Sequence, residues 1–296
     1  MAKGRELKGR IKSVENTRKI TRTMEMVATS KMKRAQDRVV AARPYANALT
    51  EVISSLYSSD LAERFPLLRQ PVTPRRVALV VLTSNRGLAG GFNANLIKEA
   101  RARIAELERT GVQVDVHVIG KKGLGYFKYV GRALASQRID ITDRPTAENA
   151  AEIVDQLMND FIAGEIDGVY VTYSKFNSAL NTPPTTDRVL PVTPPTTKGA
   201  TAGAREAGGQ RDYLLFPNAE AILTELLPSY VRNSVYRALV ETVAGEQSAR
   251  RTAMKNATDN AGDILNVLRR TYNRARQAQI TQEIAEIVGG AAALQG

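Results

Sequence analysis

The chain has 296 residues, which suits one or two domains, and its hydrophobic content of 43% is enough for a packed core. It contains no cysteine and a single histidine, which excludes disulfides, thiolate chemistry and metal sites rich in Cys or His. Lys and Arg outnumber Asp and Glu by 42 to 30, and the excess is concentrated in residues 1–44, so an anionic partner is expected there.

A long helix is predicted over about residues 2–58, within an N-terminal coiled-coil region at 1–60. Its apolar residues recur in alternating steps of four and three, which is typical of a coiled-coil seam. Pro44 is expected to bend this helix without ending it, because the seam continues beyond it. Arg18 and Glu25 interrupt the seam, which indicates an additional partner at this point. The other seam positions are Leu7, Ile11, Val14, Thr21, Ala28, Met32, Ala35, Val39, Ala42, Ala46, Leu49, Ile53 and Leu56.

No apolar segment follows the basic N-terminal residues as it would in a secretory signal, and an intracellular protein is expected. Phe65–Pro74 is expected to be a linker.

Residues 75–195 change to the pattern of an α/β domain. A strand buried on both faces is predicted at 77–82, and a glycine-rich turn follows it. Further strands are expected at 112–119 and 169–173, and helices at 93–109, about 122–129 and 147–163. Alternating strands and helices predict a mainly parallel, Rossmann-like sheet. After the last strand, Pro183, Pro184 and Pro191 are expected to end regular structure.

Residues 196–212 are rich in Gly, Ala and Thr and are expected to form a flexible loop. The C-terminal region, 213–296, is predicted to form a second long helix from the N-cap Asn218 to about Val288, which Pro228 should bend or break. This helix is expected to pair with residues 1–60 as an antiparallel coiled coil, with the α/β domain inserted between them. Its predicted seam is Ile222, Leu226, Tyr236, Val240, Val243, Met254, Ala257, Ala261, Ile264, Leu268, Ala275, Ala278 and Ala285.

The end of the second helix is expected to project beyond its partner. Residues 284–296 are almost uncharged, and such a surface exposed to water would favour aggregation. A sleeve formed by other chains is therefore expected around it.

No catalytic residue, metal site or cofactor is predicted. The Gly87–Gly91 turn matches neither the G-x-G-x-x-G pattern nor a phosphate-binding loop. His117 shares a strand face with Asp115 but has no second histidine or nucleophile to work with, so a structural role is favoured. A nucleotide-dependent enzyme built on the Gly87 turn remains an alternative hypothesis.

Several long motifs resemble those of the gamma subunit of F-type ATP synthases, and together they extend over nearly the whole chain. They are Ile11–Met32, Arg43–Tyr45, Ser84–Gly90, Glu246–Arg250, Met254–Asn260 and Ala275–Ile284. The resemblance implies a non-catalytic rotor in the central stalk, which transmits torque from the membrane c-ring to the catalytic head. The implied partners are three alpha and three beta subunits, the epsilon subunit and the c-ring. Membrane association would be indirect, on the cytoplasmic face of a bacterial cell membrane.

The resemblance also implies which residues couple the chain to the catalytic head. Met24, Lys31 and Arg34 would face an acidic lever of the beta subunit. Hydrogen bonds to alpha or beta loops are implied for Glu246, Arg250, Arg276, Gln277 and Thr281. No nucleic-acid partner is implied, although a basic coiled-coil protein that binds nucleic acid is the alternative, and its affinity would fall steeply with salt.

Overall fold

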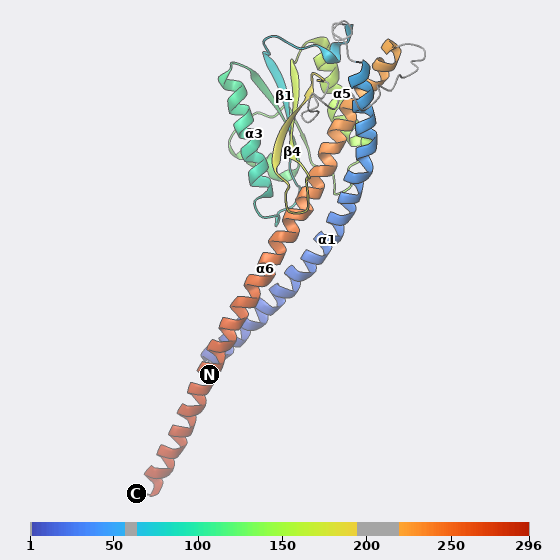
Figure 1. Ribbon diagram of the computed structural model, residues 1–296. Coiled ribbons are helices and arrows are strands. Elements are labelled where there is room, and N and C mark those ends of the chain that lie inside the picture. The colour runs from blue at the N-terminus through green and yellow to red at the C-terminus, as the bar shows by residue number, and fades with distance from the viewer. Residues whose placement is uncertain (1, 57–63, 194–218, 296) are drawn as a thin grey trace, which may run out of the picture. The chain divides into compact units, whose positions relative to one another are not determined.

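The computed structural model describes residues 2–56, 64–193 and 219–295 (Figure 1). The chain forms two compact units, of which the first consists of Met1–Thr29 and Arg250–Gly296 and the second of Ser30–Ala249. We call the first the helix-pair unit and the second the α/β unit. The predicted loop at 196–212 and the predicted N-cap Asn218 lie outside the described residues.

Two long helices contribute to both units. Helix α1 spans Ala2–Leu56 and contains Pro44, and helix α6 spans Ala219–Gln295 and contains Pro228. The prediction that the first helix continues through Pro44 is confirmed. The second helix is not broken at Pro228 either, and it runs past the predicted end at Val288.

Within the helix-pair unit, α1 and α6 are antiparallel. Thr258 Oγ1 donates a hydrogen bond to Thr21 Oγ1 at 2.8 Å, and Arg269 Nη2 lies 2.5 Å from Glu15 Oε1. Residue numbers therefore fall along α1 as they rise along α6, which confirms the predicted antiparallel pairing. Arg18, which interrupts the predicted seam, is exposed on α1.

The predicted seam is correct on α1 but is displaced by one residue on much of α6. Leu265 is 1% exposed whereas Ile264 is 50% exposed, so Leu265 is the seam residue and the prediction of Ile264 is wrong. Apolar residues on two adjacent stripes of α6 make both registers compatible with the sequence, and packing selects one of them. The same displacement occurs at three other positions of α6, where the residue after the predicted one is buried. The buried residues are Leu223, Leu227 and Thr258, and the predicted ones were Ile222, Leu226 and Ala257.

The α/β unit contains a five-stranded sheet in the order β3-β2-β1-β4-β5. Strands β1 to β4 pair in parallel, and β5 is antiparallel to β4, which confirms a mainly parallel sheet. The strands are β1 Arg76–Leu82, β2 Gln113–Ile119, β3 Ser136–Arg138, β4 Gly168–Ser174 and β5 Pro184–Leu190.

Two of these strands were not predicted. The expectation that prolines end regular structure after β4 is wrong for β5, because Pro184 is its first residue and an edge strand tolerates a missing N–H. Strand β3 has only three residues, Ser-Gln-Arg, and so carries no apolar pattern. The predicted linker contains the short 3-10 helix η1, Pro66–Leu68.

Both faces of the sheet are covered, so the α/β unit has three layers (Figure 1). Val77, Leu79 and Val81 pack on the side of α3, Phe92–Arg109, and α4, Lys121–Tyr129. The alternate residues of β1 pack on the side of α5, Ala147–Ala163, together with apolar residues of α6 and α1. Every β1 residue after Arg76 is buried, as predicted for a strand covered on both faces.

None of the helices within residues 2–56, 64–193 and 219–295 combines the length and the apolar character that a bilayer crossing requires.

The seam register predicts unequal effects of two neighbouring substitutions. Leu265→Ala should lower the free energy of unfolding of the helix-pair unit by about 2–3 kcal/mol, because it removes a buried side chain and leaves a cavity. Ile264→Ala should cost less than about 1 kcal/mol, because Ile264 is half exposed. Urea unfolding of the full chain, followed by circular dichroism, measures both, and equal losses would contradict the register.

The single histidine predicts a pH dependence of stability. His117 Nδ1 lies 2.7 Å from Ser136 Oγ, and burial lowers the pKa of His117 below its usual 6.5, although the charge of Asp115 opposes this. Below pH 6.5 the unfolded chain therefore binds this proton more readily than the folded protein does. Stability is lost as the pH falls from about 6.5 through the lower pKa of the folded state.

His117→Gln should remove this component, so the variant should lose less stability than the wild type between about pH 7 and pH 5. Carboxylate titrations are common to both proteins and cancel in the comparison. NMR titration of the imidazole gives the folded-state pKa directly, and a midpoint at or above 6.5 would refute the prediction.

Candidate functional site: the seat of helix α6 on the sheet

Open parallel sheets usually bind ligands outside the carboxyl ends of their strands, at the point where the strand order reverses. Here that point lies between β1 and β4, since the chain builds β2 and β3 on one side of β1 and β4 on the other. Residues Glu241–Ala249 of α6 occupy it, and we call them the seated segment. Ala249 at its end packs against Ala89, Phe92 and Leu96, which surround the start of α3.

Gly245 allows the seated segment to approach the end of β4. A Cβ atom at Gly245 would lie 2.4 Å from Ser174 Oγ and 3.4 Å from Phe92 Cε2. Contacts of 2.4 Å are not possible, so any larger residue would force the Ser174 side chain, α6 or β4 to shift. Glycine inside a helix costs about 1 kcal/mol relative to alanine, and the close approach accounts for its presence here.

Three hydrogen bonds join the seated segment to the last residue of β4 and to the chain that follows it. The backbone N–H of Phe176 donates to Glu241 Oε2 at 2.9 Å, and that of Ser174 donates to Thr242 Oγ1 at 3.4 Å. Ser248 Oγ donates to the carbonyl oxygen of Ala179. The α6 side chains involved are all buried, so these bonds satisfy groups that would otherwise be costly to bury.

A polar cluster beside the seat connects β4, β5 and α6. Tyr173 Oη donates to Asp187 Oδ2 at 2.7 Å, and Arg237 Nε lies 3.4 Å from Glu241 Oε1. Burial raises the pKa of Tyr173 well above its ordinary value of 10.0, and the hydrogen bond to Asp187 adds to this. Tyr173 therefore remains a neutral hydrogen-bond donor throughout the physiological pH range.

Helix α1 is attached to the α/β unit by a separate ion pair. Lys31 Nζ lies 2.5 Å from Asp143 Oδ2, and Arg38 Nη1 donates to the carbonyl oxygen of Asp143 at 3.4 Å. Asp143 belongs to the segment 139–146, which joins β3 to α5. The two paired side chains are 31% and 33% exposed, so this pair contributes no more than about 1 kcal/mol.

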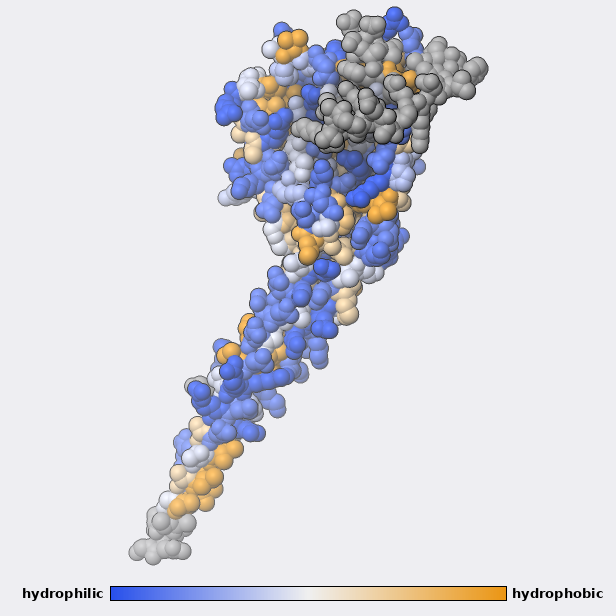
Figure 2. Space-filling model, in the orientation of Figure 1, coloured by the Kyte–Doolittle hydropathy of each residue, from blue (hydrophilic) through white to orange (hydrophobic). Residues whose placement is uncertain are grey.

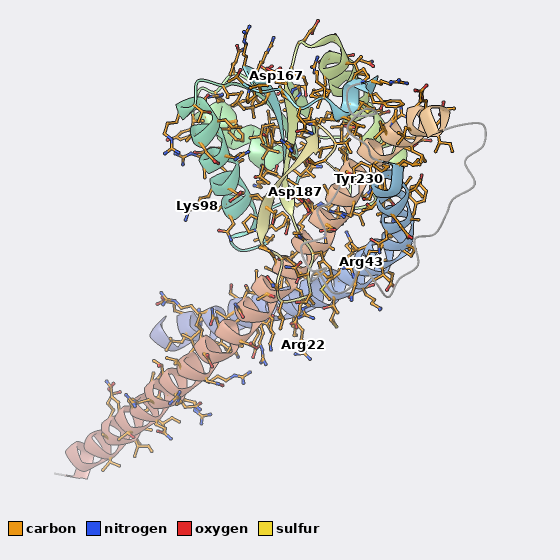
Figure 3. The ribbon with its side chains drawn as sticks, turned by 45° about the horizontal axis from the view of Figure 1, so that its top comes forward. Arg22, Arg43, Lys98, Asp167, Asp187 and Tyr230 are labelled. Atoms are coloured by element: carbon orange, nitrogen blue, oxygen red, sulfur yellow. The ribbon has the colours of Figure 1, made fainter. Side chains whose placement is uncertain are left out.

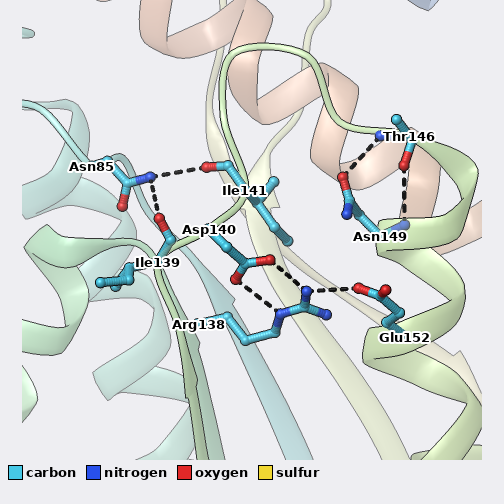
Figure 4. Close-up of polar contacts among 8 residues, drawn as sticks. All are labelled: Asn85, Arg138, Ile139, Asp140, Ile141, Thr146, Asn149 and Glu152. Atoms are coloured by element: carbon cyan, nitrogen blue, oxygen red, sulfur yellow. Dashed lines mark hydrogen bonds and ion pairs between the residues drawn. The ribbon is translucent and has the colours of Figure 1, made fainter.

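The segment 139–146 is itself fixed by side chains around it (Figure 4). Asn85 Nδ2 donates to the carbonyl oxygens of Ile139 and Ile141 at 3.0 and 2.9 Å, and its Oδ1 accepts from the N–H of Lys121 at 3.0 Å. At the far end, Thr146 and Asn149 form a reciprocal capping box that begins α5. The segment is therefore held at both ends.

The eight predicted coupling residues are divided between the two units. In the α/β unit, Lys31 is paired with Asp143, and Arg34 is exposed, with Nη2 bonded to Ser30 Oγ at 3.3 Å. Glu246 is a buried residue of the seated segment.

The other five predicted coupling residues belong to the helix-pair unit. Met24 is half-buried, and Arg250 is buried at 8% exposure. Arg276, Gln277 and Thr281 are exposed on α6, where Thr281 Oγ1 donates to the carbonyl oxygen of Gln277 at 3.0 Å. The hydroxyl of Thr281 is thus bonded within its own helix, and the two longer polar side chains are available to a partner.

The helix-pair unit presents a surface that is both basic and apolar. Its sequence holds 15 Lys and Arg against 7 Asp and Glu. Four exposed apolar residues of α6 recur at intervals that place them on one helix face, which appears as a hydrophobic region near the end of α6 in Figure 2. They are Ile280, Ile284, Ile287 and Val288. An exposed apolar face of this kind indicates a contact surface for another chain.

The seat was missed by the sequence analysis, except that Glu246 and Ser248 lie in a motif quoted there. Glu241 and Thr242 have the composition of an ordinary helix surface. Gly245 could have been predicted to lie at a close contact, because a glycine in the middle of a helical run often indicates close packing. Within the ranges that the structure describes, no three His, Asp or Glu side chains gather in a way that could hold a metal ion.

The sequence is similar to known proteins over its full length. The ATP synthase family profile matches residues 3–294. The ATP synthase gamma chain of Gemmatimonas aurantiaca is 70% identical over 296 residues, with 100% of each chain covered. That of Leptospira biflexa is 44% identical over 294 residues, covering 99% of this chain and 100% of the relative.

Solved structures share the fold. A chain of the Euglena gracilis mitochondrial ATP synthase (OSCP/F1/c-ring, rotational state 3) superimposes with a TM-score of 0.69 at 19% identity, covering 99% of this chain and 95% of that one. A chain of the Tetrahymena thermophila mitochondrial ATP synthase central stalk and c-ring gives a TM-score of 0.61 at 24% identity, covering 80% and 99%.

The close approach at Gly245 predicts a destabilising effect of the smallest possible side chain. Gly245→Ala should lower the free energy of unfolding by about 1–3 kcal/mol, because the new methyl group collides with Ser174. Adding Ser174→Gly should recover part of the loss, which a double-mutant cycle in urea unfolding measures.

Gly262→Ala is the matched control, since its Cβ would lie 3.8 Å from the Arg18 guanidinium and meets no obstacle. It should be neutral or stabilise the chain by up to about 1 kcal/mol. If Gly245→Ala behaves like Gly262→Ala, the close contact of α6 with β4 is refuted.

Proposed function

The chain belongs to the ATP synthase family and is a member of its gamma chains, and from this we propose how its structure works as the rotor subunit of the central stalk. It transmits torque between the membrane c-ring and the catalytic head, and it carries out no chemistry itself. The observation that carries this proposal is the identity of 70% to a gamma chain over the complete length of both chains.

The seat of α6 supports a mechanical role. A torque acting on the α/β unit passes into the helix-pair unit through α1 and α6, because both helices continue from one unit into the other, and the seat bears on the α6 route. Apolar packing alone resists sliding poorly, whereas hydrogen bonds depend on direction. The bonds from Glu241, Thr242 and Ser248, together with the contact at Gly245, oppose rotation of α6 about its own axis within the α/β unit.

We propose that the helix-pair unit contacts the catalytic head of three alpha and three beta subunits. Its excess of basic residues would attract acidic loops of the head. Each exposed ion pair would contribute little, so the helix-pair unit could turn past these loops without being held at one position. The exposed apolar face near Ile284 would turn within a sleeve formed by the head. The epsilon subunit and the c-ring are the proposed partners at the opposite end of the stalk.

The pairing of Lys31 with Asp143 refines the proposed role of Lys31. For Lys31 to meet an acidic lever of the beta subunit, a carboxylate of that lever must replace Asp143 or join it. The exposed ion pair costs little to exchange, so Lys31 can alternate between an internal and an external partner. Met24, Arg34, Glu246, Arg250, Arg276, Gln277 and Thr281 remain proposed contacts with alpha or beta.

The proposed location is the cytoplasmic face of a bacterial cell membrane, where the c-ring would hold the chain without any direct contact with lipid. A role in nucleic-acid binding is not proposed, because the comparisons offer no support for it.

The assembled enzyme tests the proposal. Native mass spectrometry of the purified complex should find one copy of this chain for three alpha and three beta subunits.

Ile284→Asp should lower proton-driven ATP synthesis by about tenfold or more, because it places a charge in the apolar sleeve. Gln282→Asp, which introduces the same charge at an exposed polar residue, should have a smaller effect. Unchanged synthesis after deletion of everything beyond Arg276 would contradict the sleeve.

A further inference from the structure

A cavity of about 440 Å³ lies within the α/β unit, beside the seated segment. Its walls come from the carboxyl ends of β1 and β2, from the segment 139–146, and from residues of α6 between Leu239 and Glu246. Its volume is in the range of small-molecule sites. It also lies at the edge of the sheet where doubly wound proteins bind ligands, next to the point that α6 fills.

The walls of this cavity are fixed in advance. Asn85 joins the turn after β1 to the segment 139–146 through two hydrogen bonds, which Figure 4 shows, and to the start of α4 through a third. Gly120, with a φ of 102°, brings α4 so close to β1 that a Cβ would lie 2.2 Å from the carbonyl oxygen of Thr83. A ligand would therefore find a preformed site and would not have to order a loop.

The charges of the cavity are unevenly distributed. Arg86, Lys121 and Arg144 line it and are exposed, and their side chains form no ion pair within the described part of the chain. Asp143, which also lines it, is already bound by Lys31. Glu246 contributes a buried carboxylate from the α6 wall. The cavity thus combines three cations, which form no ion pair within the described residues, with a buried carboxylate.

Between these charges the lining is apolar. Ile139 and Ile141 come from the segment after β3, and Val243 comes from α6. A bound inorganic anion would make no apolar contact with these side chains. A ligand with an anionic group, a flat apolar body and hydrogen-bond donors would use all three kinds of surface.

We propose that this cavity binds a nucleoside phosphate. The phosphates pair with Arg86, Lys121 and Arg144, and the base lies against the apolar lining. A ribose hydroxyl or a base amino group donates to the carboxylate of Glu246. Side chains hold the phosphates here, which explains why the glycine-rich turn lacks a phosphate-binding motif. This goes beyond the proposed rotor role, which requires no ligand on this chain.

Isothermal titration calorimetry of the purified full chain with ADP tests the proposal, since the isolated chain is free of nucleotide sites on other subunits. One saturable site per chain is expected, with pyrophosphate and adenosine each binding about tenfold more weakly, because each retains only part of the contacts. The double variant Arg86→Ala with Lys121→Ala should weaken ADP binding by at least about tenfold. Both side chains are exposed, so the thermal unfolding of this variant should match that of the wild type.

Lys98→Ala is the control, because Lys98 is a cation of α3 (Figure 3). It lines a different cavity. It should leave ADP binding unchanged. The proposal is overturned by the absence of saturable binding at millimolar ADP, by pyrophosphate binding as tightly as ADP, or by an equal effect of Lys98→Ala. None of these results would affect the rotor role, which the subunit stoichiometry and ATP synthesis test separately.

Discussion

The close contact between α6 and the carboxyl edge of the sheet is the constraint on which the α/β unit depends. An open parallel sheet leaves a crevice at this edge, and related topologies use that crevice for ligands. Here a helix of the same chain fills it, and Gly245 is the residue that permits the approach. The backbone N–H groups of Ser174, the last residue of β4, and of Phe176 just beyond it find their acceptors on α6. The sheet thus binds a helix where other sheets of this kind bind a cofactor.

The two kinds of contact that α6 makes have different mechanical consequences. The seam between α1 and α6 is mainly apolar, and its contact energy changes gradually with register because dispersion and burial have no preferred direction. The contacts of the seated segment are directional and buried, so a small rotation of the helix breaks several at once. By contrast, the pair between Lys31 and Asp143 is partly exposed and adds little rigidity. The seat therefore holds α6 in the α/β unit more firmly than this ion pair holds α1.

Much of the fold could be predicted from the sequence, and the failures have identifiable physical causes. The α1 seam was predictable because the spacing of four and three residues continues along nearly the whole helix. In α6, Ile264 and Leu265 are compatible with two registers, and packing selects the one that buries Leu265. Strand β5 was not predicted because Pro184 argues against a strand inside a sheet, and the sequence does not reveal that this strand lies at an edge. The coupling residues came from the family resemblance alone. Their division between two units, and the internal pairing of Lys31, depend on contacts between residues far apart in the sequence.

The helix-pair unit combines an excess of basic residues with an exposed apolar face. Basic residues outnumber acidic ones by about two to one, so copies of this surface repel one another electrostatically, and the exposed apolar face lies on the same unit. Attraction to an acidic partner acts over about a Debye length, so it varies smoothly as the surfaces move. Apolar contact acts only at short range and adds affinity without fixing an orientation. A surface that must stay in contact while turning is best served by this combination, because neither force requires a specific pair of atoms to remain together.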